Sequence, residues 1–303
     1  MLKKHVFIFM IILFNSCSDN QVDTLVEDKL TFIPDSNFEQ LLIDLGIDSD
    51  GIINGRVLET DISVVIYLPI ANSNISDLSG IENFVNLKKL DCFNNQLTSL
   101  DVSQNTALKE LNCRDNQLTS LDVSQNTELT SLLCAGNQLT SLDVNQNTAL
   151  ATLGCSMNQI SSLDVSQNTA LTLLYCSENK LTNLDVSQNI KLIELFFWNN
   201  KLTSLDVSLN TALTELYCFE NQIKNLDLSK NTALTIISCG SNELMSLNVK
   251  NGNNLIITSF NATGNIDLQC IQVDDKTAAN QGQLPYNKWI KDTNVTYSED
   301  CTN

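Results

Sequence analysis

The chain has 303 residues, 43% of them apolar and 17% charged, and these fractions exclude both a disordered protein and a multi-span membrane protein. Its 17 basic and 35 acidic residues give a net charge of −18, which makes an extended polyanion such as nucleic acid an unfavourable partner. The one histidine, His5, lies in a segment that we expect to be removed. No histidine-dependent nucleophile system or imidazole metal site is therefore expected in the mature protein.

Residues 1–16 predict a secretory signal peptide. Lys3 and Lys4 precede an apolar run over residues 6–14, which is too short to span a bilayer. Cys17 follows directly, and this pattern resembles the cleavage site of bacterial lipoproteins, with a looser lipobox. The resemblance implies cleavage before Cys17 and acylation of that cysteine, and two or more acyl chains would anchor the protein stably. A plain signal peptide with an incidental cysteine is the alternative.

Residues 17–30 form a predicted tether, and residues 31–63 a predicted N-terminal cap. Pro34 and Asp35 precede apolar residues at helical spacing, which predicts a short amphipathic helix that closes the first coil of the repeats that follow. The apolar positions of this helix are Phe38, Leu41, Leu42 and Leu45.

The cap also contains the run Asp48-Ser49-Asp50-Gly51, which matches half of a calcium-binding loop. In that pattern Gly46 and Val57 would occupy ligand positions, and neither has a side-chain oxygen. We therefore interpret the run as a polar turn.

Residues 64–265 are predicted to form a stack of coils, because the sequence has a 21-residue period from Leu87 onward. Apolar and outward positions alternate at two places in each unit, which predicts extended chain on both sides of a coil. A lone coil cannot cover its own apolar side chains, so coils must stack, with parallel strands about 4.8 Å apart.

Two columns show the period clearly. The cysteine position recurs at Cys92, Cys113, Cys134, Cys155, Cys176, Phe197, Cys218, Cys239 and Phe260. The asparagine three residues later recurs at Asn95, Asn116, Asn137, Asn158, Asn179, Asn200, Asn221 and Asn242. We predict that this asparagine column, and a second one that includes Asn105, are structural and hydrogen-bond the backbone at the corners of the coils.

The unit Leu-x-x-Leu-x-Cys-x-x-Asn-x-Leu-x-x-Leu-Asp-Val resembles the short, 21-residue bacterial leucine-rich repeat. The resemblance covers residues 68–265 and implies a right-handed solenoid with a parallel sheet on its concave face and a mostly irregular or β convex side. Residues 74–81 are similar to an internalin-type repeat. Leu68 and Ile70 align with Leu90 and Cys92 only if that coil is one position longer than the others, so the register changes in the first coil.

The cysteines fall into two groups. Those on the 21-residue grid are predicted to be buried, inert thiols, because parallel inward side chains are poorly placed to bridge. Cys270 and Cys301 lie off the grid, and in an exported chain we expect them to form a disulfide that fastens a C-terminal cap over residues 266–303. No metal-ligand set or cofactor motif is found, and no cofactor is expected.

The outward positions that flank the cysteine column vary between coils. In three consecutive coils they place aromatic residues side by side, which is typical of a recognition site. These residues are Tyr175, Phe196, Trp198, Tyr217 and Phe219, with Glu178, Asn199 and Glu220 as a predicted polar rim. The hypothesis is that this patch binds a protein or a glycan. The alternative is that a cap or a dimer partner covers the rings.

A regular column of aspartates follows the second apolar set of each coil. It contains Asp101, Asp122, Asp143, Asp164, Asp185, Asp206 and Asp227. Stacked like charges repel, so we expect these carboxylates to be solvated and hydrogen-bonded locally, with calcium binding as the alternative.

Nothing in the sequence supports catalysis, and we expect a protein that is not an enzyme. The prediction is a leucine-rich repeat lipoprotein on the outer-membrane surface of a bacterium, which recognises a protein or mediates adhesion through its concave face. The alternatives are a glycan-binding or nutrient-capture accessory protein and a structural envelope protein.

Overall fold

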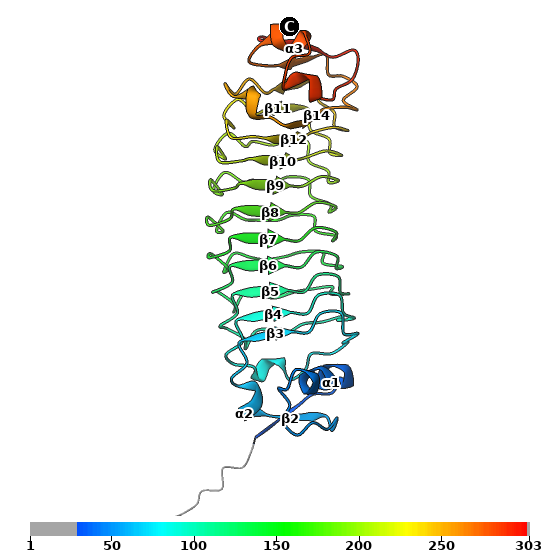
Figure 1. The fold of residues 1–303 in the computed structure, drawn as a ribbon, viewed down its shortest axis with the longest axis vertical. Helices are drawn as coiled ribbons and strands as arrows, with labels where there is room; N and C mark the ends of the chain where they lie inside the picture. The colour runs from blue at the N-terminus through cyan, green and yellow to red at the C-terminus, as the bar shows by residue number, and fades with distance from the viewer. Residues whose placement is uncertain (1–28, 302–303) are drawn as a thin grey trace, which may run out of the picture.

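The computed structural model describes residues 29–301, and these form an elongated stack of coils with a cap at each end (Figure 1). The predicted signal peptide, the lipidation site Cys17 and nearly all of the tether lie outside the described residues. Between residues 29 and 301, no helix is long and apolar enough to cross a membrane.

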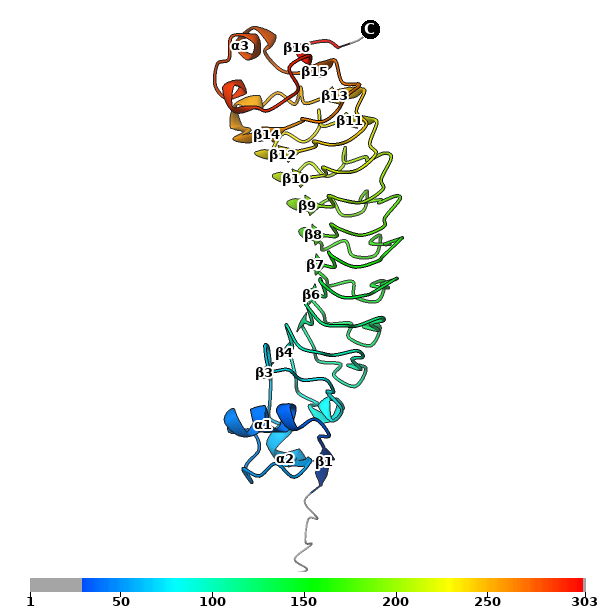
Figure 2. The same cartoon turned by 90° about the vertical axis from the view of Figure 1, so that its right-hand side faces the viewer.

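One sheet of ten parallel strands runs the length of the stack, and each strand is short. In chain order the strands are β3 (Tyr67–Pro69), β4 (Lys89–Asp91), β5 (Glu110–Asn112), β6 (Ser131–Leu133), β7 (Thr152–Gly154), β8 (Leu173–Tyr175), β9 (Glu194–Phe196), β10 (Glu215–Tyr217), β12 (Ile236–Ser238) and β14 (Ser259–Asn261). Figure 2 shows this sheet on the inner side of a curved stack. The predicted parallel-strand solenoid is therefore confirmed.

The opposite side of the stack has fewer strands. A four-stranded parallel sheet forms there towards the C-terminus, from β11 (Asn225–Asp227), β13 (Ser246–Asn248), β15 (Cys270–Gln272) and β16 (Thr296–Ser298). In the earlier coils this side is mostly unpaired, with a single bridge between Asp101 and Asp122 among the described residues. The expected mixture of irregular and β structure on the outer side is confirmed.

The register of the main sheet follows the repeat. Leu174 pairs with Leu195 and Leu195 with Leu216, so each residue lies directly beside its equivalent in the next unit. Leu68 pairs with Leu90, which confirms the longer first coil that the sequence predicts. As a result, the apolar positions form continuous buried columns.

The first asparagine column joins each coil to the one before it. Asn116 donates from Nδ2 to the carbonyls of Cys92 and Cys113, at 3.0 and 3.1 Å, and its Oδ1 accepts from the amide of Leu97 at 3.0 Å. The carbonyl of Cys113 also accepts from Asn137 in the next coil, so the asparagines form a continuous ladder along the corner. The predicted structural role of this column is confirmed, because it pairs buried backbone groups at the corners.

The second asparagine column works in a similar way on another corner. Asn126 donates from Nδ2 to the carbonyls of Val102 and Asn105, both at 2.9 Å. The Oδ1 of Asn126 has no hydrogen-bond partner among the described residues, so this column stabilises each corner through donors only. We expect it to contribute less per residue than the first column.

The N-terminal cap consists of a two-stranded antiparallel sheet, β1 (Leu30–Phe32) with β2 (Arg56–Leu58), and two short helices, α1 (Ser36–Asp44) and α2 (Glu59–Ile62). Helix α1 buries Phe38 and Leu42, and the ring of Phe38 stacks on Phe84 of the first coil at 6.2 Å. The predicted helical plug is confirmed, except that Leu45 ends the helix and is 40% exposed.

Two acidic side chains fasten this cap. Asp35 accepts from the amide of Phe38 at the start of α1 and from the amide and hydroxyl of Ser76 in the first coil. Glu39 is buried and accepts from three consecutive amides over residues 54–56. The run over residues 48–51 is a turn in which Asp50 accepts from the amide of Ile52 at 2.8 Å. The cap is therefore held by carboxylates that satisfy backbone donors.

At the C-terminal end the repeat changes length, and one sequence prediction is wrong. Phe260 pairs with Ile237, so Ala262, and not Phe260, follows Cys239 in the inward column. That coil is two positions longer than its neighbours, and it contains the short 3-10 helix η2 (Asn254–Ile256). A constant period of 21 residues predicts Phe260 in the cysteine column, and this is wrong because the turn of this coil contains two extra residues.

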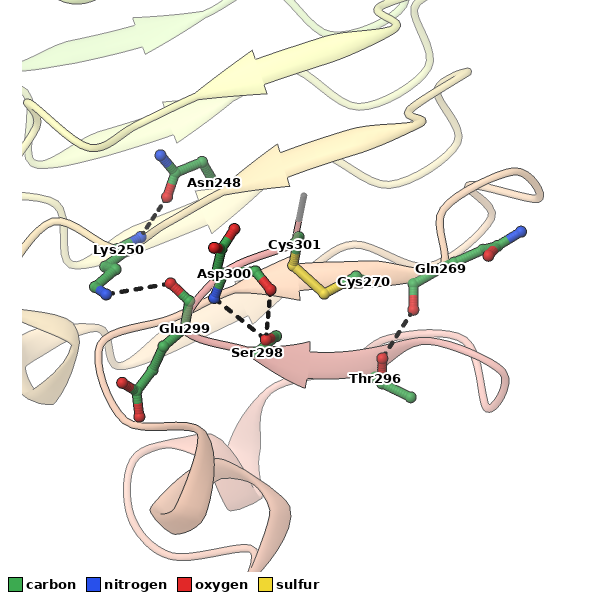
Figure 3. Close-up of a disulfide and its surroundings, with 9 residues drawn as sticks. All are labelled: Asn248, Lys250, Gln269, Cys270, Thr296, Ser298, Glu299, Asp300 and Cys301. Atoms are coloured by element: carbon green, nitrogen blue, oxygen red, sulfur yellow. Dashed lines mark hydrogen bonds between the residues drawn. A yellow bond between two sulfur atoms is a disulfide. The ribbon is translucent and has the colours of Figure 1, made fainter. Parts of the chain in front are cut away.

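The last coil is covered by aromatic residues and a disulfide. Trp289 stacks on Phe260 at 4.3 Å, in a cap that includes α3 (Lys276–Asn280) and the 3-10 helix η3 (Tyr286–Lys288). Cys270 of β15 is bonded to Cys301, which fixes the chain after the terminal strand β16 (Figure 3). The predicted disulfide is confirmed, and its two cysteines are 31 positions apart in the sequence.

Candidate functional site

The structure brings together the five aromatic residues that the sequence singled out. Tyr175, Phe196 and Tyr217 end the strands β8, β9 and β10, and Trp198 and Phe219 follow two residues later. Between them the side chains of Cys176, Phe197 and Cys218 are fully buried, so the five rings point away from the core, on the solvent-facing side of the main sheet and the inner side of the curved stack. We call this set of Tyr175, Phe196, Trp198, Tyr217 and Phe219 the aromatic face.

The rings of the aromatic face form two rows. In the first row Phe196 lies 4.9 Å from Tyr175 and 4.4 Å from Tyr217, in tilted and edge-on arrangements. In the second row Trp198 and Phe219 are stacked at 5.1 Å with an angle of 5° between their planes. Such pairs contribute about 0.5–1.5 kcal/mol each beyond the burial of area. Each ring is only partly exposed because it packs on its neighbours.

Two carboxylates lie beside the first row. Glu194 and Glu215 occupy the first positions of β9 and β10 and are directly paired in the sheet. The hydroxyl of Tyr175 donates to Glu194 at 2.5 Å. Sequence reasoning missed both residues because it considered only the positions next to the cysteine column. The two-residue period of a strand, applied one step further back, would have placed them on the same face.

Burial and the two carboxylates favour the protonated form of the titratable side chains in this part of the face. Burial, the hydrogen bond to Glu194 and the charges of both glutamates raise the pKa of Tyr175. Burial, and then the two carboxylates, raise the pKa of Tyr217. Burial and the neighbouring Glu194 raise the pKa of Glu215. Both tyrosines therefore keep their protons at neutral pH and can donate hydrogen bonds.

The predicted rim residues Glu178, Asn199 and Glu220 form the turns after the strands. All three have a left-handed backbone, with φ of 52°, 52° and 54°. Their amides donate to the carbonyls of the next coil, for example Glu178 to Trp198 at 2.8 Å. Neither Glu178 nor Glu220 forms an ion pair with any residue between 29 and 301. The structure thus places these carboxylates beyond the second row of rings, and their role in binding stays a prediction.

The same surface is different at the N-terminal end of the sheet. There Lys89 lies 5.3 Å from the ring centroid of Tyr67 and 2.8 Å from the carboxylate of Glu110. The guanidinium of Arg114 lies 5.3 Å from the ring of Phe93. In the first coils, then, the exposed rings of this sheet contact basic side chains of the protein itself.

The aspartate column is structural. In the regular coils an Oδ1 of the aspartate accepts from the amide two residues later, as Asp101 does from Ser103 at 2.9 Å. The amide and hydroxyl of that serine lower the pKa of Asp101, and the equivalent bonds act on Asp122 and Asp164. The expected local hydrogen bonding is confirmed, and within the described part of the chain no cluster of three or more acidic, cysteine or histidine side chains could hold a metal ion.

The cysteine column consists of seven free thiols, all buried in the core. Burial raises the pKa of Cys113, Cys155 and Cys239 to about 12, and it raises the pKa of the other four well above the usual value. A thiol that stays protonated is a poor nucleophile and a poor metal ligand. The predicted packing role of these thiols is confirmed.

These pKa values give a direct prediction for thiol chemistry. We expect none of the seven grid cysteines of the folded protein to react with a disulfide reagent such as DTNB at about pH 8, and all seven to react in denaturant. Fast labelling of even one grid cysteine in the folded state, located by mass spectrometry, would contradict this. The Cys270–Cys301 pair serves as the internal control, since it reacts in neither state without a reductant.

Comparisons with known proteins agree with this fold. No protein-family model and no curated protein sequence matches the chain. Among solved structures, the functional domain of InlJ from Listeria monocytogenes, described as including a cysteine ladder, is 35% identical and superposes with a TM-score of 0.75. The match covers 90% of this chain, which spans 62% of the length of that domain.

Two further structures share the fold at lower identity. A leucine-rich repeat protein from Leptospira interrogans is 23% identical with a TM-score of 0.62, over 77% of this chain and 62% of its own. The leucine-rich repeat ectodomain of the Arabidopsis thaliana receptor kinase GASSHO1/SCHENGEN3, solved with CASPARIAN STRIP INTEGRITY FACTOR 2, is 20% identical with a TM-score of 0.56, over 65% of this chain and 28% of that chain. This chain has the leucine-rich repeat fold of these structures.

Proposed function

We propose that this protein is a leucine-rich repeat recognition protein that binds a protein ligand through the aromatic face. The observation that carries the proposal is the row geometry: three consecutive coils present five rings that pack on one another and remain partly exposed. Tyrosine and tryptophan are enriched among the residues that dominate binding energy at protein interfaces, and phenylalanine is also enriched at such interfaces. The plant ectodomain was solved in complex with CASPARIAN STRIP INTEGRITY FACTOR 2, which supports the view that a leucine-rich repeat solenoid can hold a ligand.

The proposal includes the export and anchoring that the N-terminal sequence predicts. A signal peptide and an acylated Cys17 would hold the solenoid at the bacterial outer membrane, with the aromatic face several coils away from the anchored end. Adhesion to a neighbouring or host cell is the use that this arrangement favours. The rival use is glycan capture, because a flat tryptophan such as Trp198 can also stack on a sugar ring.

The experiment uses binders selected without assuming a ligand. Purified protein is screened against a random peptide display library and a glycan array, and the selected binders are then measured on the double variant Trp198→Ala/Tyr217→Ala. We expect peptide binders to lose at least about tenfold in affinity, because these residues are central to the face. Sugars that bind and show the same loss would favour the glycan-capture rival.

The matched control changes the same coils on their other side. Ile190 and Leu209 are both 57% exposed and lie outside the main sheet. The double variant Ile190→Ala/Leu209→Ala removes similar apolar area without touching the aromatic face, and it should keep wild-type affinity. Equal affinity of the wild type and both variants for every selected binder would overturn the proposed site and would favour a structural envelope role.

A further inference from the structure

We propose that the ligand of the aromatic face is basic: a protein segment whose lysine or arginine side chains lie against the rings and pair with Glu194 and Glu215. This rests on the proposed function and adds the chemical class of the partner to it. Three parts of the sheet surface point to a basic ligand: the carboxylate pair, the cations that contact exposed rings at the other end of the sheet, and the charge around the aromatic face.

The first part is the pair of carboxylates beside the rings. Glu194 and Glu215 are direct neighbours on adjacent parallel strands, an arrangement in which like charges repel. The hydroxyl of Tyr175 donates to Glu194 but carries no positive charge. Across residues 29–301 the ion pairs are Lys89 with Glu110 and Lys109 with Glu128, and neither involves the aromatic face. A cation placed between Glu194 and Glu215 would remove this repulsion.

The second part is the N-terminal end of the same sheet, where exposed rings and a carboxylate contact basic side chains of the protein itself. Tyr67, Lys89 and Glu110 occupy the same strand position in three successive coils, with the ammonium group between the ring and the carboxylate. Arg114 lies over the ring of Phe93, and both residues occupy the position that Trp198 has in its own coil. The N-terminal coils therefore carry their own cations on their exposed rings. The aromatic face also combines rings with carboxylates, although its rings occupy later positions of the strand segment than Tyr67 does, and no lysine or arginine stands among its outward residues, so a ligand can supply the cation.

The third part is the charge of the surface. The outward positions of each coil are the first and third residues of the strand and the second residue after it. In the coils from 152 to 240, none of these positions holds a lysine or an arginine. Four glutamates flank the ring positions along the chain: Glu194 and Glu215 at the starts of β9 and β10, and Glu178 and Glu220 in the turns that follow β8 and β10. A neutral ligand that covered these groups would have to desolvate unpaired charges, and an acidic ligand would be repelled. A basic segment satisfies both the rings and the carboxylates.

The structure offers a built-in reporter for the experiment. The chain has two tryptophans, Trp198 on the face and Trp289 buried in the C-terminal cap with 7% exposure. A change in tryptophan emission on binding therefore reports on Trp198. The probe is a dye-labelled peptide rich in lysine and arginine, and its control is the same peptide with acetyl-lysine and citrulline. We expect the basic peptide to bind at least about tenfold more tightly, and its affinity to fall about tenfold between roughly 0.05 and 0.5 M NaCl.

The decisive variant is Glu194→Gln/Glu215→Gln, which keeps the shape of both side chains and removes their charge. We expect it to weaken the basic peptide by about tenfold in fluorescence anisotropy. The control Glu128→Gln/Glu243→Gln removes two charges elsewhere on the molecule and should change affinity by less than about twofold. Equal losses in the two double variants, or no loss in the first, would overturn the proposal, because attraction would then come from net charge or not involve these carboxylates.

The two proposals fail in different ways. Suppose that library-selected binders are lost in Trp198→Ala/Tyr217→Ala but kept in Glu194→Gln/Glu215→Gln, with no preference for lysine or arginine among them. The aromatic face would then stand as the recognition site, and its assignment to a basic ligand would be wrong. If neither double variant affects any binder, the proposed function fails together with the inference.

Discussion

Replacing Asn200 with alanine should lower the free energy of unfolding by about 2–4 kcal/mol, because a buried amide would lose its partner and two buried carbonyls would each lose a donor. The Oδ1 of Asn200 accepts from the amide of Leu181 at 2.9 Å, and its Nδ2 donates to the carbonyls of Cys176 and Phe197, at 3.1 and 3.0 Å. The unpaired amide should account for most of the cost, since the carbonyls keep the donors of the neighbouring asparagines. The loss should appear in chemical denaturation and, locally, as faster hydrogen exchange at the amide of Leu181.

The same change should also reach the aromatic face. Asn200 follows Trp198 by two residues and holds the turn that fixes the backbone on which the indole is carried. We therefore expect Asn200→Ala to weaken ligand binding even under conditions where the protein stays folded.

Asn137 provides the matched control for this prediction. It makes equivalent bonds, to Cys113 and Cys134 at 3.0 Å each and from Leu118 at 3.0 Å, in a coil that carries no ring of the aromatic face. Asn137→Ala should cost as much stability and leave binding unchanged. An amide of Leu181 that stays fully protected in Asn200→Ala would show that the side chain is not the partner on which this corner depends.

The second large effect is expected at Phe197, the one aromatic residue in the cysteine column between Cys92 and Cys239. Its ring is completely buried between Cys176 and Cys218. Phe197→Ala removes most of that volume from a core whose coils are fixed on both sides, so the cavity cannot easily close. We expect a loss of about 3–5 kcal/mol in the free energy of unfolding.

Graded substitutions at this position separate the cavity from other effects. Phe197→Leu keeps more of the volume and should cost less than about 1.5 kcal/mol by the same denaturation measurement. Phe196 and Trp198 are the chain neighbours of Phe197 and point away from the core. Movement of the backbone into the cavity of the alanine variant should therefore also disturb the aromatic face. A cost of Phe197→Ala no larger than that of Phe197→Leu would mean that the ring is not packed as the structure has it.

Much of the fold follows from the repeat because stacking turns a spacing in sequence into a neighbour in space. Once Leu174, Leu195 and Leu216 are taken as equivalent, the inward cysteines, the corner asparagines and the outward rings are all placed by counting. The prediction was wrong at Phe260 for the same reason. Two extra residues enter the turn near η2, and nothing in the local sequence shows on which side of Phe260 they must be counted.

The candidate site was only partly predictable. The five rings were found because large apolar side chains at outward positions are conspicuous against a polar repeat. Glu194 and Glu215 were not found, because glutamate is an ordinary residue for an exposed strand position. Their meaning comes from the contact between Tyr175 and Glu194 and from the contrast with Lys89, which are relations between coils that the sequence alone does not display.

Between Val102 and Ala151 every coil has the same length of 21 residues, and this bears on how such a protein can change. A gain or loss of one whole unit between Val102 and Ala151 would shift the aromatic face along the stack by one strand spacing, about 4.8 Å, and would leave every contact within it intact. Duplication of a coil therefore changes the distance between the aromatic face and the N-terminal end of the stack. Point substitutions at outward positions of a few coils change which ligand the face accepts, so distance and specificity can vary separately.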